Sequence, residues 1–272
     1  MSAGQAATYS SAARAFDQVA HTYDQLFTNT AIGRAQRKQV WPRLLAAFPP
    51  GSRVLELNCG TGEDARFLAE QGRAVLACDG SAMMIRVARS REGGLGERNL
   101  EFRQLANEEL GKLSVTTPFD GAFSNFSGLN CVLELPAVAA DLAHRVRTNG
   151  RVLICFWSRW CVAEVIWYLA QGRPRKAVRR FLGTATARVG GTTFPVAYPS
   201  VREIQASFSP WFRLRSRRAV GLFVPPSYLE PHIGRHPRIL GGLESLDRLC
   251  ASWPALRDFG DHVLLEFVRC NL

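Results

Sequence analysis

Short, continuously apolar runs alternate with helix-like segments between Arg53 and Trp157. Parallel strands are buried on both faces, and each needs a long connection, usually a helix, to reach the next. The alternation therefore predicts a parallel sheet covered by helices on both faces. The predicted strands are Arg53–Asn58, Ala74–Asp79, Leu100–Gln104, Asp120–Phe126 and Arg151–Trp157, and the predicted helices are Glu63–Gln71, Ala82–Arg91 and Val132–Arg147.

The chain on either side of this block reads differently. Residues 14–48 have the apolar spacing of helices, which Pro49-Pro50-Gly51 ends. After Trp157 come an aromatic helix, a basic run and the segment VGGTTFPVAYPS, which reads as a loop-rich insertion. The segments WFRLRSRRAVGLFVPP and DHVLLEFVRC predict two late strands, paired antiparallel at the sheet edge, with a helix over Leu240–Leu256 between them.

The composition is that of a folded domain with a real core, because 47% of the residues are hydrophobic and 21% are charged. The N-terminus lacks an apolar run, so we expect no signal peptide. Arg159 and Glu164 interrupt the longest apolar stretch, which argues against a membrane-spanning helix. The seven cysteines show no metal-ligand spacing, so we expect no metal site, and reduced, buried thiols of a cytoplasmic protein.

The positive charge is concentrated in one segment. The formal net charge is +11, and residues 171–218 hold eleven basic residues and a single acid, Glu203. A local patch of this kind indicates an anionic partner, such as an acidic group on a substrate or an anionic membrane surface. Nucleic acid is the less favoured partner, because no RNA-binding module is recognisable. A solvated helix face remains the alternative.

The segment VLELNCGTGEDARFLAEQG, residues 54–72, has the strand, glycine turn and helix of a nucleotide-like binding site. It fits the dinucleotide fingerprint, with Asp79 placed nineteen residues after Gly60. Glu56 distinguishes the ligands. A carboxylate at this turn repels a pyrophosphate but attracts the ammonium and sulfonium groups of S-adenosylmethionine. We therefore predict S-adenosylmethionine rather than NAD.

With these residues the chain resembles the class I S-adenosylmethionine-dependent methyltransferases, in the branch of ubiquinone-type and small-molecule enzymes. The resemblance covers Arg14 to Trp157 and the final strand. It implies a Rossmann-like α/β fold, a seven-stranded, mostly parallel sheet with an antiparallel edge pair and helices on both faces. The segments that carry it are FDQVAHTYDQLF, VLELNCGTGEDARFLAEQG, VLACDGSAMMIRVAR, FDGAFSNFSGLN and HRVRTNGRVLICFW.

The same resemblance implies where the cofactor binds. In this family an acid at the position of Asp79 holds the ribose hydroxyls, and a methionine at the position of Met84 covers the adenine. His21, Tyr23 and Asn125 are the candidates for contact with the reacting centre. The implied cofactor-binding residues are Tyr23, Glu56, Asn58, Cys59, Gly60, Gly62, Asp79, Gly80, Ser81, Met84, Ala106, Asn107 and Asn125.

Two positions depart from the family pattern. Asn58 stands where the first glycine of the turn is usual, and Ala106 where an acid commonly contacts the adenine amine. Asparagine tolerates positive φ, so Asn58 keeps the turn at modest cost. Its amide either bonds the methionine end of the ligand or only supports the turn. Asn107 is the candidate to take over the adenine contact.

Methyl transfer is an in-line displacement that mainly needs positioning and exclusion of water. We therefore expect a methyltransferase acting on a small, lipophilic or acidic molecule. Two alternatives remain: an RNA or protein methyltransferase that docks through the basic insertion, and a non-catalytic S-adenosylmethionine-binding protein.

His262 begins the last predicted strand and is expected to be structural. The expected segments are 1–50, a helical lid; 51–157, the cofactor core; 158–210, the acceptor-binding insertion; and 211–272, the edge strands and C-terminal helix.

Overall fold

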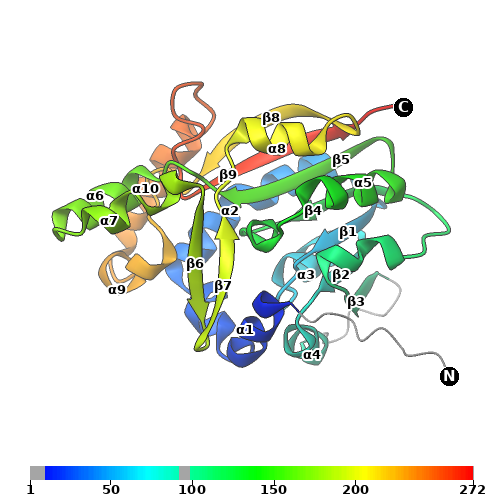
Figure 1. Ribbon diagram of the computed structural model, residues 1–272, viewed down its shortest axis with the longest axis horizontal. Helices are drawn as coiled ribbons and strands as arrows, with labels where there is room; N and C mark the ends of the chain where they lie inside the picture. Colours follow the sequence, from blue (N-terminus) through cyan, green and yellow to red (C-terminus); the bar gives the residue numbers. More distant parts are fainter. Residues whose placement is uncertain (1–9, 92–98, 272) are drawn as a thin grey trace.

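The computed structural model describes residues 10–91 and 99–271 (Figure 1). Residues 1–9, 92–98 and 272, which belong to the predicted lid, cofactor core and C-terminal segment, lie outside the described residues. One large sheet runs through the molecule. Its strands are β1 (Arg53–Leu57), β2 (Ala74–Asp79), β3 (Leu100–Gln104), β4 (Phe119–Ser124), β5 (Val146–Trp157), β8 (Phe212–Val220) and β9 (His262–Arg269).

The sheet has seven strands in the order β3-β2-β1-β4-β5-β9-β8. The first five are parallel, and β9 and β8 are added antiparallel at the edge. This confirms the predicted fold class, including the antiparallel edge pair. The order changes direction between β1 and β4, which is where open α/β sheets form a ligand-binding crevice.

Helices cover both faces of the sheet. Leu44 of α2 and Leu68 of α3 belong to the buried cluster on one face, while Leu142 of α5 and Phe208 of α8 belong to the cluster on the other. The two layers enclose the strands because each strand offers apolar side chains to both sides. The helices are α1 (Ser11–Val19), α2 (Ala31–Ala47), α3 (Glu63–Glu70), α4 (Ala82–Ser90), α5 (Leu135–Arg145), α6 (Val162–Ala170), α7 (Pro174–Ala177), α8 (Val201–Phe208), α9 (Glu230–Ile233) and α10 (Pro237–Cys250), with a π-helix at Asp24–Thr28.

Several predicted boundaries were wrong by a few residues. β4 ends at Ser124, because Phe126 has φ of 46° and leaves the extended conformation. The helix predicted over Val132–Arg147 starts at Leu135 and ends at Arg145, since Val146 already pairs with Phe119 of β4. The last helix spans Pro237–Cys250 rather than Leu240–Leu256.

The segment VGGTTFPVAYPS is not a loop. It forms most of a hairpin of β6 (Thr184–Val189) and β7 (Thr192–Ala197), a separate two-stranded sheet. Gly190 and Gly191 make the turn with φ of 53° and 85°, which side chains disfavour. Proline is unusual inside a strand, but β7 contains Pro195. Both strands of a two-stranded sheet are edge strands, where proline is accepted.

The hairpin and the N-terminal helix lie together across one end of the sheet (Figure 1). Gln18 of α1 donates a hydrogen bond to the Thr192 hydroxyl at 3.0 Å, and Phe16 packs against Phe194. The seven cysteines are free thiols, four of them buried. Within residues 10–91 and 99–271, no helix is both long and apolar enough to cross a membrane.

Candidate active site

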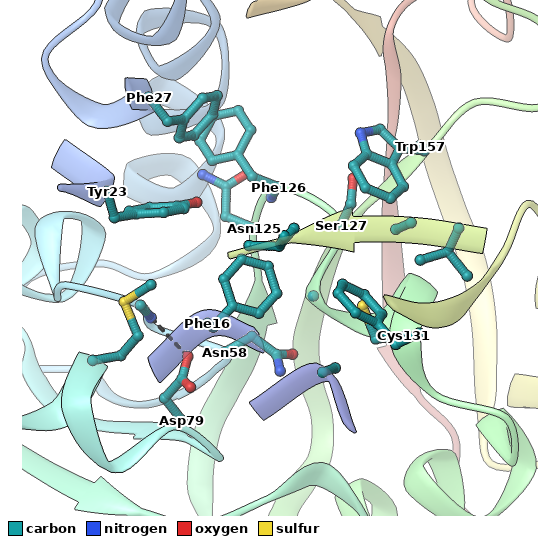
Figure 2. A pocket seen from close by; sticks show the side chains of 18 of the residues that line it. Phe16, Tyr23, Phe27, Asn58, Asp79, Asn125, Phe126, Ser127, Cys131 and Trp157 are labelled. Carbon is teal, nitrogen blue, oxygen red and sulfur yellow. Dashed lines mark hydrogen bonds between the residues drawn. The ribbon is translucent and has the colours of Figure 1, made fainter. Parts of the chain in front are cut away.

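A cavity of about 550 Å³ lies at the carboxyl ends of β1, β2, β4 and β5. Parallel strands bring the residues that follow them to one edge of the sheet, so Gly60, Asp79, Asn125 and Trp157 meet here although they are distant in sequence. The hairpin β6–β7 and α1 form the opposite wall. Figure 2 shows Asp79 and Tyr23 on one side of the space and Trp157 on the other.

Asp79, at the end of β2, fixes the glycine turn that follows β1. Its Oδ2 accepts a hydrogen bond from the Gly60 backbone N–H at 2.9 Å, and its Oδ1 accepts one from the Ser81 N–H at 2.8 Å. Burial raises the pKa of Asp79, and these two backbone donors partly oppose that rise. The carboxylate therefore lines the cavity with its position set by the backbone on both sides.

Asn58 adopts the positive φ predicted for it, at 57°. The Ser124 hydroxyl donates a hydrogen bond to its Oδ1 at 3.1 Å. Within the described part of the chain, its Nδ2 donates no hydrogen bond, and the residue lines the cavity. The side chain therefore has its oxygen engaged and its two N–H donors available.

Asn125 belongs to a network centred on Asp64. Asp64 Oδ1 accepts hydrogen bonds from Arg37 Nε at 3.0 Å and from Trp41 Nε1 at 2.6 Å. Its Oδ2 accepts one from Asn125 Nδ2 at 2.9 Å, while Asn125 Oδ1 accepts the Phe126 N–H at 3.0 Å. Both ends of the Asn125 amide are thus engaged, so the residue forms a fixed part of the cavity wall.

Glu56 is 1% exposed and lies beneath the turn, outside the set of residues that line the cavity. Burial raises its pKa well above the ordinary value, and the nearby Asp64 adds to the rise. Its Oε2 has no hydrogen-bond partner among the described residues. Burying a carboxyl oxygen without a hydrogen-bond donor lowers the stability of the fold, so the lack of a partner for Oε2 needs an explanation.

Tyr23 and His21 were predicted together, but only Tyr23 lines the cavity. Tyr23 lines the cavity, and burial raises its pKa to about 12 against the lowering effect of Arg37. Its hydroxyl is therefore protonated at neutral pH and can donate a hydrogen bond. His21 is exposed and is not among the residues that line the cavity.

Ten of the predicted cofactor-binding residues line the cavity. They are Tyr23, Asn58, Cys59, Gly60, Asp79, Gly80, Met84, Ala106, Asn107 and Asn125. The other three predicted residues, Glu56, Gly62 and Ser81, do not line the cavity. Gly62 precedes α3 with φ of 78°, and a Cβ there would lie 2.5 Å from the Phe102 ring. Ser81 caps α4 by accepting the Met84 N–H at 3.0 Å. Gly62 therefore shapes the glycine turn before α3, and Ser81 shapes the start of α4.

The cavity continues past these residues into a part that sequence reasoning largely missed. Phe126, Trp157, Tyr198 and Tyr228 line it, together with His262. His262 is 3% exposed, and its ring centroid lies 5.6 Å from that of Phe126. Burial lowers its pKa, although Asp261 opposes this, so the imidazole is neutral at neutral pH. The expectation of a purely structural His262 is therefore incomplete, because β9 pairs with β5 and brings the residue beside Trp157 at the cavity wall.

Two arginines of the basic run are not free charges. Arg180 Nη2 lies 2.7 Å from Glu164 Oε2 and 2.8 Å from Asp261 Oδ1, and both carboxylates are buried. Arg179 Nε lies 2.8 Å from Glu164 Oε1. Two cations thus meet two anions at the far end of the cavity. Arg179 and Arg180, which belong to the basic segment 171–218, are therefore paired inside the molecule and do not add free charge to it.

Comparisons with known proteins agree with this geometry. Residues 54–150 match a family model described as a methyltransferase domain. The demethylmenaquinone methyltransferase of Thermobifida fusca is 31% identical over 144 residues, which cover 53% of this chain and 59% of the relative. The tRNA 5-carboxymethoxyuridine methyltransferase of Escherichia coli is 28% identical over 177 residues, covering 61% and 67%. The first alignment therefore spans less than two thirds of the relative's length.

The solved structures support the fold over almost the whole chain. The DhpI-SAH complex superposes with a TM-score of 0.59 at 19% sequence identity, covering 97% of this chain and 98% of that one. A likeness at this level of identity concerns the arrangement of strands and helices.

Proposed function

We propose that this chain, which carries a domain of the class I S-adenosylmethionine-dependent methyltransferase family, methylates a small, lipophilic organic molecule. The observation that carries the proposal is the continuity of the cavity. One space joins the turn at Gly60 and Asp79 to an aromatic part walled by Trp157 and the insertion. A cofactor and a small acceptor therefore have room side by side.

The residues present fit S-adenosylmethionine. A Cβ on Gly60 would point toward Tyr23 Cε1 at 3.8 Å, so the absence of a side chain leaves room beside the turn. Asp79 presents two oxygens suited to ribose hydroxyls, and the unsatisfied Glu56 oxygen suits a nearby cationic ligand. Met84, Ala106 and Asn107 are proposed to surround the adenine. When bound, this cofactor supplies an activated methyl group.

The acceptor part of the cavity favours an uncharged molecule. Aromatic side chains line it, and Arg179 and Arg180 at its far end are paired with Glu164 and Asp261. The acidic alternative therefore keeps only Arg188 of β6, which lines the cavity without an ion pair among the described residues. The insertion at residues 158–210 would recognise the acceptor, and contact with an anionic membrane is the proposed route by which a lipophilic acceptor arrives.

The chain's own residues then position the acceptor and accept its proton. Asn125 and Phe126 hold the end of β4 against the reacting centre, and α1 with the hairpin excludes water. For an oxygen or nitrogen acceptor, His262 is the proposed proton acceptor, because it is neutral and its Nδ1 lies 3.4 Å from Asp261 Oδ2. Tyr23, being protonated, is a donor rather than a base.

Calorimetric titration tests the cofactor assignment. S-adenosylmethionine should bind and NAD should not; tighter binding of NAD would overturn the proposal. An untargeted metabolite screen, read out by S-adenosylhomocysteine formation, then identifies the acceptor. With that acceptor, His262→Asn should lower kcat while leaving S-adenosylmethionine affinity unchanged.

A second candidate function is methylation of RNA. The similarity to a tRNA methyltransferase and the exposed arginines outside the ion pairs favour it. A complex with tRNA that weakens steeply with salt would support this candidate. Binding of S-adenosylmethionine without turnover on any acceptor would instead support a non-catalytic role, the alternative raised by Asn58 and Ala106. The cytoplasm, with its reduced thiols, is the proposed compartment.

A further inference from the structure

Helix α6 exposes apolar side chains and buries a charged one, which is the reverse of an ordinary surface helix. Its apolar residues Val162, Ile166 and Leu169 are 43%, 63% and 54% exposed. They are spaced by four and three residues, so they share one face. Its one charged residue, Glu164, is 1% exposed. With about 100° of turn per residue, Glu164 points away from the apolar face, so the helix buries its charge and exposes its aliphatic side chains.

The buried charge is firmly held, so the exposure of the apolar face is a consequence of the packing. Glu164 pairs with Arg179 and Arg180 and accepts a hydrogen bond from the Tyr228 hydroxyl at 3.3 Å. Rotating α6 to hide Ile166 would remove Glu164 from these partners. The apolar stripe is therefore fixed toward the outside of the molecule.

Exposed cations follow the stripe directly. Arg173, Arg175 and Lys176 are exposed in and before α7, which packs beside α6 (Figure 1). Neither Arg173 nor Arg175 forms an ion pair with a described residue. Between residues 158 and 202, Glu164 is the single acid of the sequence, and it is buried. The surface at this end thus combines apolar and positively charged side chains.

We propose that this docking face, comprising Val162, Ile166, Leu169, Arg173 and Arg175, binds the surface of a bilayer that contains anionic phospholipids. Aliphatic side chains enter the boundary between headgroups and acyl chains, while long basic side chains reach the phosphates. An anionic bilayer satisfies both halves of the face. A second copy docking through the same face would bring more cations and no exposed acid, because Glu164 is the single acid of residues 158–202 and is buried.

The docking face adjoins the cavity. Arg179, Arg180 and Tyr228, which hold the inner side of α6, also line the cavity wall. Tyr168 of α6 stacks on Tyr228 with ring centroids 6.0 Å apart. A lipophilic acceptor leaving the bilayer would therefore emerge close to the acceptor part of the cavity. This delivery rests on the proposed function, whereas the docking itself does not.

Vesicle sedimentation tests the docking face. Wild type should bind vesicles of roughly three parts phosphatidylcholine to one part phosphatidylserine, and bind pure phosphatidylcholine weakly. I166D/L169D should lose most of this binding. R173Q/R175Q should weaken it by roughly tenfold or more, since each cation near an anionic surface is worth about fivefold in partition. The R173Q/R175Q effect should shrink at high salt.

Matched controls separate the docking face from overall charge and apolarity. R202Q/R213Q removes the same charge from two exposed arginines on α8 and β8, which lie far from α6 (Figure 1). L133D adds an acid at a leucine that is 74% exposed outside the docking face. Both controls should bind vesicles like wild type. Thermal melting and S-adenosylmethionine titration should be the same for all variants.

Three outcomes would overturn the inference. The first is failure of wild type to bind the anionic vesicles at low salt, and the second is a loss of binding in R202Q/R213Q as large as that in R173Q/R175Q. In a third outcome, light scattering would show a wild-type dimer that I166D/L169D converts to a monomer, which assigns the face to a second copy. None of these results bears on S-adenosylmethionine binding, whose failure would count against the proposed function alone.

Discussion

A Cβ atom on Gly128 would lie 2.3 Å from the Cβ atom of Asn58. The side chain of Asn58 thus occupies the space that the missing side chain of Gly128 leaves open. The turn after β1 has a side chain where a glycine is usual, and the loop after β4 provides a glycine opposite it. The two loops remain in close contact.

This contact predicts a dependence between the two positions. Gly128→Ala should lower the melting temperature and S-adenosylmethionine affinity, because the new methyl group collides with Asn58. In an Asn58→Gly background the same change should cost much less, since the three atoms nearest to the new methyl group belong to Asn58. A double-mutant cycle measured by thermal unfolding checks this. Additive effects of the two changes would contradict the contact.

Asn58→Gly alone should weaken S-adenosylmethionine binding by about 1 kcal/mol, or roughly fivefold. Glycine keeps the positive φ but loses the Nδ2 donors, which no described residue accepts. Isothermal titration gives the dissociation constant. An unchanged value would mean that Asn58 only supports the turn.

Glu56→Gln should stabilise the protein and weaken its cofactor binding. Glu56 holds its proton more tightly in the folded chain, so its contribution to stability is complete below the ordinary pKa of about 4.3. That contribution is lost as the pH rises through the raised folded pKa. Glutamine cannot ionise, so the gain in melting temperature should be larger at about pH 8 than at about pH 5.

The same carboxyl should link cofactor binding to pH. A cationic ligand favours the ionised form of Glu56, so binding should release a proton and S-adenosylmethionine affinity should increase as the pH rises through the Glu56 pKa. Glu56→Gln should be weaker by roughly tenfold at neutral pH and should lack this contribution to the pH dependence. Equal pH profiles for the two proteins would contradict a role of Glu56 in binding.

Asp79→Ala should weaken S-adenosylmethionine binding tenfold or more, since a hydrogen bond to a charged group is worth about 1.5–3 kcal/mol. The loss includes a looser turn, because Asp79 also accepts the Gly60 and Ser81 N–H groups. Gly60→Val should abolish binding by filling the space beside Tyr23. Calorimetry measures both, and near wild-type affinity of either variant would contradict the assigned site.

Arg180→Ala should destabilise the fold by about 3–5 kcal/mol, because Glu164 and Asp261 would be left buried with fewer partners. Arg175→Ala, which removes an exposed side chain of the same type, should leave stability unchanged. Urea unfolding compares the two. Equal stabilities would mean that the network around Arg180 contributes nothing net.

The sequence was sufficient for the features that local patterns determine. The strands ending near Asn58 and Asp79 are short apolar runs, and their parallel pairing follows from the helix between them. The positive φ of Asn58 follows from its place in the turn. Gly190-Gly191 is also a hairpin signal in the sequence, and the expectation of a loop overlooked it.

The acceptor part of the cavity depends on contacts between distant segments. His262 reaches the cavity because β9 pairs with Trp157 on β5, more than a hundred residues earlier in the chain. The charge of Arg180 is plain in the sequence, but its partners Glu164 and Asp261 lie on two other elements. No periodicity or spacing rule identifies such partners, so the basic run appeared to be free charge.

The insertion leaves the sheet after Trp157 and the chain returns to it at Phe212, with β6 and β7 paired only to each other. Substitutions, insertions or deletions in the hairpin therefore break no hydrogen bond of the seven-stranded sheet. The glycine turn at Gly60 and the carboxylate of Asp79 belong to other elements. If the proposed function holds, the molecule that is methylated can therefore change over evolutionary time while the cofactor site is inherited unaltered.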